Sequence, residues 1–292
     1  MGIYWLASYP KSGNTWFRLI LHGVRASPED VLDINQINTG SIASSRFWLE
    51  SVLGVDTSYF SSQELDALKP AIYRWHAEAQ ESLSYHKIHD AYTYLPNGDP
   101  MIPVAGCLGA LYFIRNPLDV AISFANHSQV SIDQSIDMMA RENAALARSK
   151  HRYQAQARQK LLSWSSHVKS WLDADIHCLV IRYEDMIMRP QQVFRRALSF
   201  LQLDPSDDLL ATVIEKTAFD NIQRIEREQG FREKPQFVKQ FFRKGVMGDW
   251  QATLSQSQID RIISSHGEIM QKFGYLDSAG NPLVGNELTV ST

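Results

Sequence analysis

The stretch Ser8-Tyr9-Pro10-Lys11-Ser12-Gly13-Asn14-Thr15-Trp16, SYPKSGNTW, joins the apolar run IYWLA at residues 3–7 to FRLILHGV at residues 17–24. The continuous apolar run predicts a buried strand over Ile3–Ser8. Apolar residues at i, i+3, i+4 and i+7 predict a helix that starts near Asn14. Between them Pro10 stiffens the turn and Gly13 allows close approach of the backbone. A strand, a tight loop and a helix N-terminus form a credible cradle for an anion.

The lysine of this loop does not follow the common nucleotide-phosphate pattern G-x-x-x-x-G-K-[ST]. Ala7 stands where the first glycine would be, and Lys11 precedes Gly13. On the local residues alone, two interpretations stay open. One is an anion site to which Lys11 adds a full charge, and the other is an ordinary strand–turn–helix with a solvated lysine.

Three further apolar runs predict strands at Leu83–Ile88, Leu108–Ile114 and His177–Arg182. Helical patterns lie between and after them, one behind Pro190 and one over residues 259–270. This alternation predicts an α/β fold, a single domain with a central parallel sheet flanked by helices. Ligands bind beyond the carboxyl ends of such strands. SYPKSGNTW, KIHD (87–90) and RNPLDVAIS (115–123) all fall at those ends.

We expect one domain over residues 1–276, with helical insertions or lids at 25–75 and 126–170 and a frayed tail over 277–292. Residues 223–244 carry seven Arg and Lys against three Glu, an excess of four positive charges.

A second anion site is indicated where the strand ending in Arg115 meets a helix. Asn116 can cap that helix and Pro117 suits its first position. Asp119 and Ser123 are four residues apart and share a helical face. Taken alone, the pattern is more often that of a surface arginine beside a capped helix. Together the two sites imply a ligand with two separated anionic groups, such as a nucleotide phosphorylated at both ends of its ribose.

Composition narrows the class of protein. The chain has 292 residues and a net charge of −3, which argues against a general nucleic-acid or membrane-surface binder. No apolar run approaches 18 residues, so we expect no membrane span, and the first residues do not resemble a signal peptide. Cys107 and Cys178 lie in apolar runs, and we expect buried free thiols and a cytoplasmic setting. No ligand spacing indicates a metal.

Three ordered motifs resemble those of the cytosolic sulfotransferases. SYPKSGNTW resembles their 5′-phosphosulfate loop, IRNPLDVAIS (114–123) their 3′-phosphate motif, and FFRKGVMGDW (241–250) their C-terminal R-K-G-x-x-G-D-W signature. KIHD, RYEDM (182–186) and KTAF (216–219) fall in the same order. The resemblance runs from about Ile3 to Phe273 and is closer to bacterial members of the family. It implies a P-loop-like sulfotransferase fold in which residues 223–244 form a flexible cap over the donor.

The resemblance implies a donor substrate, 3′-phosphoadenosine 5′-phosphosulfate (PAPS), which leaves as 3′-phosphoadenosine 5′-phosphate (PAP), with no metal. By resemblance the 5′-phosphosulfate is held by Lys11, Ser12, Gly13, Asn14 and Thr15. The 3′-phosphate is held by Arg115, Ser123, Arg243, Lys244 and Gly245. Trp16, Tyr183, Thr217 and Phe219 frame the adenine, in agreement with the tendency of aromatic faces to stack on bases.

His89 follows the predicted strand SYHKI (84–88) and matches the catalytic histidine of the family. We expect it to remove the proton of an acceptor hydroxyl while the oxygen attacks sulfur in line. Lys11 stabilises the developing charge, and Lys87, two residues before His89, assists. Two alternatives are a kinase-like phosphotransferase and an inactive relative that binds PAP or PAPS. The missing Walker order argues against the first, and the retention of Lys11 and His89 against the second.

The acceptor is expected to be a small hydroxylated compound, aromatic or amphipathic, because the variable segments are rich in aromatics. Each aromatic in these segments, taken singly, is more often core or lid packing. The candidates for the acceptor pocket are Phe47, Trp48, Tyr59, Phe60, Tyr73, Trp75, Tyr92, Tyr94, Phe124 and His127.

Three departures from the family pattern qualify the resemblance. Asn14 replaces a threonine of many relatives and could still cap the helix. HDAY (89–92) departs from the continuation seen in animal enzymes. Gln251 replaces a lysine, and QATLSQSQID (251–260) does not reproduce the dimer motif K-x-x-x-T-V-x-x-x-E, so a homodimer would need another surface.

Overall fold

The computed structural model describes residues 2–27, 32–147, 154–235 and 237–285. The chain forms two compact units, each built from three segments. The sheet unit comprises residues 1–9, 39–113 and 141–180, and the helical unit comprises residues 10–38, 114–140 and 181–292. The chain passes from the sheet unit to the helical unit after Tyr9, Phe113 and Val180.

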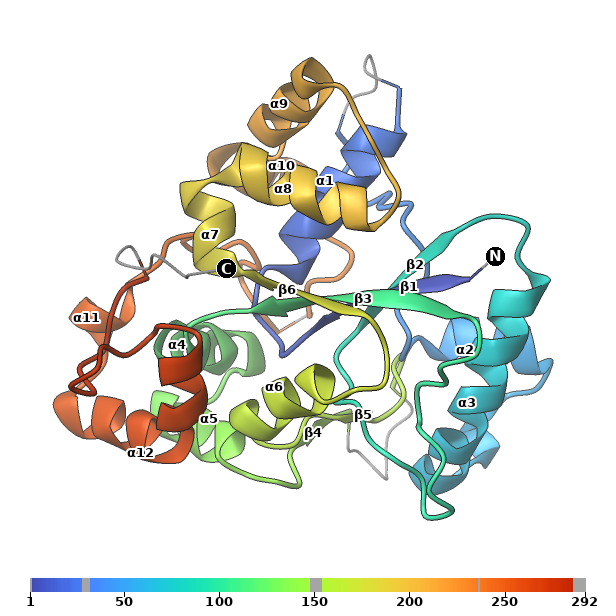
Figure 1. The fold of residues 1–292 in the computed structure, drawn as a ribbon, viewed down its shortest axis with the longest axis horizontal. Helices are drawn as coiled ribbons and strands as arrows, with labels where there is room; N and C mark the ends of the chain where they lie inside the picture. Colours follow the sequence, from blue (N-terminus) through green and yellow to red (C-terminus); the bar gives the residue numbers. More distant parts are fainter. Residues whose placement is uncertain (1, 28–31, 148–153, 236, 286–292) are drawn as a thin grey trace. The chain divides into compact units, whose positions relative to one another are not determined.

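The central sheet has four strands in the order β2-β1-β3-β6 (Figure 1). They are β1 (Ile3–Ser8), β2 (Ser84–Ile88), β3 (Cys107–Ile114) and β6 (Cys178–Arg182). Strand β1 pairs in parallel with both β2 and β3, and all of its residues are buried. The predicted α/β class with a central parallel sheet is confirmed. Burial on both faces explains why the first run is apolar throughout.

Three helices of the sheet unit cover one face of this sheet: α2 (Arg46–Leu53), α3 (Ser62–Ala79) and α6 (Trp164–Leu172). Trp5 of β1 packs edge-on against Tyr73 of α3, with ring centroids 4.9 Å apart. Tyr112 of β3 lies on the same face, because its register partner is Ala7, two residues beyond Trp5. Its hydroxyl lies 2.8 Å from Nδ1 of His167 in α6.

The sheet unit also contains a short 3₁₀ helix, η1 (Thr57–Tyr59), and a two-stranded antiparallel ribbon of β4 (Ala145–Leu146) and β5 (Gln159–Lys160). Apart from this ribbon, the two segments predicted to be insertions, residues 25–75 and 126–170, consist of helix and loop where the structure describes them. Residues 28–31 and 148–153 of these segments lie outside the described residues.

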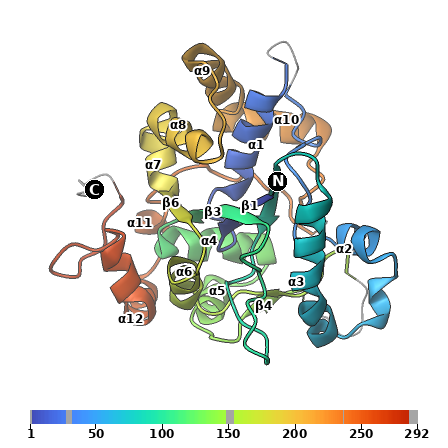
Figure 2. The ribbon, with the colours of Figure 1, turned by 45° about the vertical axis from the view of Figure 1, so that its right-hand side comes forward.

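The helical unit contains α1 (Asn14–Arg25), α4 (Pro117–Ser128), α5 (Ile132–Met139), α7 (Tyr183–Met188), α8 (Pro190–Phe200), α9 (Asp207–Lys216), α10 (Phe219–Gln229), α11 (Trp250–Thr253) and α12 (Gln256–Lys272). Figures 1 and 2 show α1 beside α8 and α9, and α4 beside α5 and α12. As predicted, Pro190 occupies the first turn of α8. None of the helices in the described ranges is long and apolar enough to cross a membrane.

Two details of the termini and thiols differ from the sequence-based expectation. Residues 277–285 form a turn in which the amide of Leu283 bonds to the carbonyl of Tyr275, whereas residues 286–292 lie outside the described part of the chain. Cys107 and Cys178 are free thiols but only partly buried. Desolvation nevertheless raises the pKa of Cys107 to about 11 and that of Cys178 to about 12.

Candidate active site

The loop after β1 contains two residues in the left-handed conformation, Lys11 with φ 69° and Gly13 with φ 94°. Gly13 is the N-cap of α1, and its carbonyl accepts the first helical bond from Phe17. The suggestion that Asn14 caps the helix is therefore wrong. A Cβ at Gly13 would lie 2.7 Å from Cδ2 of Tyr183, so glycine is the residue that this packing admits.

This loop has the features of an anion cradle. The first-turn amides of α1 have no acceptor within the helix, and no acidic residue occupies that turn. Ser12, Asn14 and Thr15 are buried. The Ser12 hydroxyl has no hydrogen-bond partner among the described residues. The ammonium of Lys11 lies 3.9 Å from the ring centroid of Phe241, within the range of a cation–π contact.

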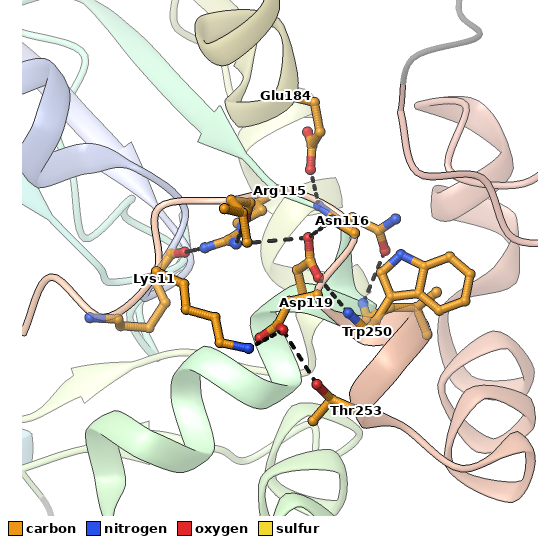
Figure 3. A network of polar contacts seen from close by, with 12 residues as sticks. Lys11, Arg115, Asn116, Asp119, Glu184, Trp250 and Thr253 are labelled. Carbon is orange, nitrogen blue, oxygen red and sulfur yellow. Dashed lines mark hydrogen bonds and ion pairs between the residues drawn. The ribbon is translucent and has the colours of Figure 1, made fainter. Parts of the chain in front are cut away.

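Arg115 joins three segments of the helical unit (Figure 3). Its guanidinium stacks 4.3 Å above the ring of Tyr183 and donates to the carbonyl oxygens of Lys11 at 3.3 Å and Val246 at 2.9 Å. Its Nε is buried and has no partner among the described residues. The predicted 5′ loop and C-terminal signature therefore meet at one arginine.

The signature FFRKGVMGDW is held together by Asp249. Its carboxylate accepts from Arg243 at 2.6 Å and from Lys244 at 2.5 Å. Burial raises the pKa of Asp249, but the hydrogen bonds from these two cations outweigh it, so the pKa lies below its usual value. Two cations assigned to the 3′-phosphate thus share one acidic side chain.

Asp119 in the first turn of α4 contacts the same signature (Figure 3). One of its carboxylate oxygens accepts from the Gly248 amide at 2.8 Å and the other from the Trp250 amide at 3.1 Å. Burial raises the pKa of Asp119, while Arg115 and the two amides oppose that shift.

Helix α4 begins as predicted, with the Asn116 side chain accepting from the Leu118 amide at 3.0 Å and Pro117 in the first turn. The backbone amide of Asn116 donates to the buried carboxylate of Glu184 at 2.9 Å. Glu184 also accepts from the Tyr275 hydroxyl at 2.9 Å, and burial raises its pKa. Ser123 is half-buried further along α4.

The four residues predicted to frame the adenine differ in their surroundings. Trp16 packs edge-on against Tyr183, with centroids 6.3 Å apart. Phe219 packs so tightly on Gly245 that a Cβ there would lie 2.0 Å from the ring. Thr217 is fully buried, and its hydroxyl donates to the Val213 carbonyl at 2.8 Å. Thr217 is the C-cap residue of α9, and its hydroxyl is bonded within that helix end.

All the residues predicted to bind the donor belong to the helical unit, whereas His89 and Lys87 belong to the sheet unit. His89 is half-buried just beyond β2. Its Nδ1 lies 2.8 Å from the Ser8 carbonyl oxygen and 3.2 Å from the Ser8 hydroxyl. Because a carbonyl oxygen only accepts, Nδ1 carries the proton, and in the neutral ring the lone pair is on Nε2.

The backbone at His89 is also anchored. Nε2 of the buried His167 lies 3.1 Å from the His89 carbonyl oxygen, and burial lowers the pKa of His167 to about 4. The next residue, Asp90, is buried and contacts the Lys69 ammonium at 3.3 Å. Its carbonyl accepts from the Trp171 indole at 3.1 Å. Lys87 is 9% exposed, and its carbonyl accepts from the Ala43 amide at 2.8 Å.

The candidate acceptor aromatics do not form one cluster. Buried members are Trp48, Tyr73, Tyr92 and Phe124, and strongly exposed ones are Phe47, Tyr59, Trp75 and Tyr94. Trp48 and Tyr73 stack on each other with centroids 5.8 Å apart, as parts of the core. Phe60 is half-buried, and His127 lies edge-on to Phe241. Within the described ranges, no cluster of three or more His, Cys, Asp and Glu is arranged to hold a metal ion.

Sequence reasoning assigned no role to Asp119, Glu184 or Asp249, although each lies inside a quoted motif. Asp119 and Glu184 each bond to groups far away in the sequence, and Asp249 pairs with two cations at once. The spacing of residues in the sequence does not predict such partners. One signal in the sequence did point to a role for Asp119. It lies in the first turn of the helix that follows Arg115, and the helix already has Asn116 as its N-cap.

A parallel sheet whose first strand leads through a cationic loop into a helix N-terminus defines an α/β protein of the nucleotide-binding type. Residues 3–274 match the model of the sulfotransferase domain, and the chain belongs to this family and is a sulfotransferase. Sulfotransferase 1 family member D1 of Rattus norvegicus is 22% identical over 275 residues, 91% of this chain and 83% of the relative. Cytosolic sulfotransferase 17 of Arabidopsis thaliana is 21% identical over 294 residues, 94% of this chain and 76% of the relative.

Solved structures show the same fold. Mouse sulfotransferase SULT7A1 complexed with PAP aligns with a TM-score of 0.60 and 19% identity, covering 96% of this chain and 87% of that one. Retinol dehydratase in complex with androsterone and PAP aligns with a TM-score of 0.58 and 17% identity, covering 92% and 80%.

Proposed function

We propose that the protein transfers a sulfuryl group from PAPS to the hydroxyl of a small aromatic or amphipathic acceptor and releases PAP. The observation that carries this proposal is the set of contacts at Arg115. Through them the cationic 5′ loop and the Arg243-Lys244 signature come together within the helical unit. A donor with anionic groups at both ends of a ribose matches two cationic subsites in one unit.

The side chains present fit such a donor. The buried Ser12 hydroxyl and the buried Arg115 Nε have no partner among the described residues, and each could bind an anionic oxygen. Lys11 and the N-terminus of α1 would hold the 5′-phosphosulfate together with Gly13, Asn14 and Thr15. Arg115, Ser123, Arg243, Lys244 and Gly245 would hold the 3′-phosphate. Trp16, Tyr183, Thr217 and Phe219 would frame the base.

His89 acts as the base in this proposal. Its Nε2 accepts the proton of the acceptor hydroxyl while the acceptor oxygen forms a bond to sulfur. The bond between sulfur and the bridging oxygen breaks, and PAP leaves with both electrons of that bond. Lys11 stabilises the charge that develops on the bridging oxygen, and Lys87 assists. The Nδ1 hydrogen bond to Ser8 supports this role, because it directs the ring's lone pair to Nε2.

The acceptor class rests on the aromatic content of the variable segments and on analogy. Retinol dehydratase, which shares the fold, is solved with the small hydroxylated molecules androsterone and retinol. We further propose that the enzyme works in the cytoplasm and belongs with the bacterial members of the family. Any homodimer would use a surface other than the C-terminal motif that QATLSQSQID fails to reproduce.

Ligand-induced stabilisation tests the donor assignment. We expect PAP to raise the melting temperature in a concentration-dependent manner and ATP to have no comparable effect. Stabilisation by ATP and not by PAP would favour the kinase-like alternative.

Transfer of labelled sulfate from PAPS to a panel of phenols and alcohols tests the reaction itself. Transfer to a panel member that is lost in His89→Gln supports the proposal. Hydrolysis of PAPS without any sulfated product, unchanged in His89→Gln, would contradict the role of the base.

A further inference from the structure

The carboxylate of Asp119 is 98% buried yet bonds to no group of its own helix. Asp119 occupies the third position of α4, from which an acidic side chain commonly reaches back to the amide of the N-cap residue. Here that amide, of Asn116, donates to Glu184 instead. Glu184 therefore accepts from the N-cap amide in place of Asp119, and both oxygens of Asp119 contact a distant segment.

That segment is the stretch from Arg243 to Trp250. Asp119 accepts from the amides of Gly248 and Trp250, 129 and 131 residues later in the chain. These two amides flank Asp249, whose side chain holds Arg243 and Lys244. A continuous path of hydrogen bonds therefore leads from α4 through the backbone to both cations.

The connection that precedes α4 contacts the segment a second time. Arg115, between β3 and the N-cap Asn116, donates to the Val246 carbonyl at 2.9 Å and lies 3.8 Å from Asp119. The segment is thus fixed at three backbone groups by two side chains of opposite charge. Gly248 has φ 79°, so the backbone between these anchors turns sharply in a conformation that favours glycine.

We propose that Asp119 is a positioning residue for the 3′-phosphate subsite: it holds the Arg243–Trp250 segment so that Arg243, Lys244 and Arg115 act on the same anionic group. The proposal rests on the proposed function, since that function assigns these cations to the 3′-phosphate. Asp119 itself, a buried anion, does not contact the phosphate. Substitution of Asp119 therefore weakens the contribution of the 3′-phosphate to donor affinity and leaves the contribution of the rest of the nucleotide unchanged.

A comparison of PAP with adenosine 5′-phosphate, which lacks the 3′-phosphate, isolates that part by calorimetry. Asp119→Asn keeps the shape of the side chain but turns an amino group toward one of the two backbone amides. We expect its PAP affinity to fall about 10- to 100-fold, as for loss of a charged hydrogen bond. Its affinity for adenosine 5′-phosphate should change less than about twofold. Asp133→Asn, an exposed acid of α5 paired with Arg261, is the matched control and should change neither affinity.

Equal losses for both nucleotides, or no loss for either, would overturn the positioning role. A wild-type protein that binds PAP no more tightly than adenosine 5′-phosphate would instead overturn the 3′-phosphate assignment of the proposed function. Asp119→Glu, which retains the charge and displaces the carboxylate by one methylene, provides a second variant if Asp119→Asn does not fold. It should show the same selective loss for PAP, and equal losses for the two nucleotides in this variant would count against the proposal.

Discussion

The Ser8 carbonyl oxygen accepts a hydrogen bond of 2.8 Å from Nδ1 of His89. Ser8 is the last residue of β1, and His89 follows β2, the strand that pairs with β1 in register from Ile3 to Ala7. The sheet therefore fixes both partners, and the tautomer of the ring follows from main-chain geometry.

The first prediction concerns His89 as the base. Gln at this position can still donate to the Ser8 carbonyl but cannot take up a proton. We expect kcat of His89→Gln to fall about 10²- to 10⁴-fold, the usual contribution of a general base. PAP affinity should stay within about twofold, since the residues proposed to bind the donor belong to the helical unit. His177→Gln, an exposed histidine before β6, is the control, and single-turnover kinetics with calorimetry give both quantities. Unchanged kcat in His89→Gln would refute the assignment.

The second prediction concerns the charge of Lys11. Lys11→Met keeps an extended chain that can contact Phe241 but removes the ammonium. We expect kcat at saturating PAPS to fall about 10²- to 10³-fold, with PAP affinity reduced less than about 10-fold, because in the proposed mechanism the charge acts mainly on the leaving oxygen. Lys272→Met at the exposed end of α12 is the matched loss of charge. A larger effect on PAP affinity than on kcat would mean that Lys11 only binds the ground state.

The third prediction concerns the contact of Gly13 with Tyr183. Alanine at Gly13 adopts an unfavourable φ and places its Cβ 2.7 Å from the Tyr183 ring. We expect Gly13→Ala to lower the free energy of unfolding by roughly 2–4 kcal/mol, the sum of backbone strain and overpacking.

Gly54→Ala separates the two effects of the third prediction. Gly54 has φ 71° in the same left-handed conformation as Gly13 and nothing within 4 Å of an added Cβ, so only the strain of roughly 1–2 kcal/mol should remain. Urea denaturation measures both variants. Equal losses would show that the ring moves aside without cost.

The fourth prediction concerns pH and two buried histidines of the sheet unit. Burial, with a smaller effect of nearby His76, lowers the pKa of His86 to about 3, and burial lowers that of His167 to about 4. Between those values and about 6.5, the unfolded chain binds protons that the folded chain does not. Stability should therefore fall as pH falls below about 6.5, by about 2 kcal/mol per histidine at about pH 5.

His86→Gln tests the fourth prediction, because glutamine can still donate to the Ser41 carbonyl and does not titrate. The decline in unfolding free energy between about pH 6.5 and 5 should become about half as steep. His177→Gln should leave it unchanged. A slope in His86→Gln as steep as in the wild type would show that other groups cause the acid sensitivity.

The four strands of the central sheet were predicted within one residue of their bounds, because parallel strands tend to form continuous apolar runs. The two-residue strands β4 and β5 were not predicted, because so short a strand has no sequence pattern of its own. The starts of α4 and α8 were predicted because proline and an N-cap side chain act locally. The cap of α1 was not, because the choice of Gly13 depends on Tyr183, 170 residues later.

The candidate site was predictable in its composition but not in its connections. Motif resemblance indicated Lys11, Arg115, Arg243 and Lys244 without indicating that Asp249 holds the last two. Carboxylate partners are set by tertiary packing, and no periodicity in the chain encodes them. The roles of the individual donor residues stay predictions until they are tested by substitution.

The chain crosses between the units five times, after Tyr9, Asn38, Phe113, Ala140 and Val180, and this has a practical consequence for dissecting the molecule. No single cut in the chain separates one unit from the other, because each is assembled from three stretches of sequence. A fragment that ends after Phe113 would contain two of the three stretches of the sheet unit and one of the three stretches of the helical unit. The residues proposed for nucleotide binding and for proton removal therefore cannot be recovered on separate contiguous fragments, and their roles must be separated by point substitution.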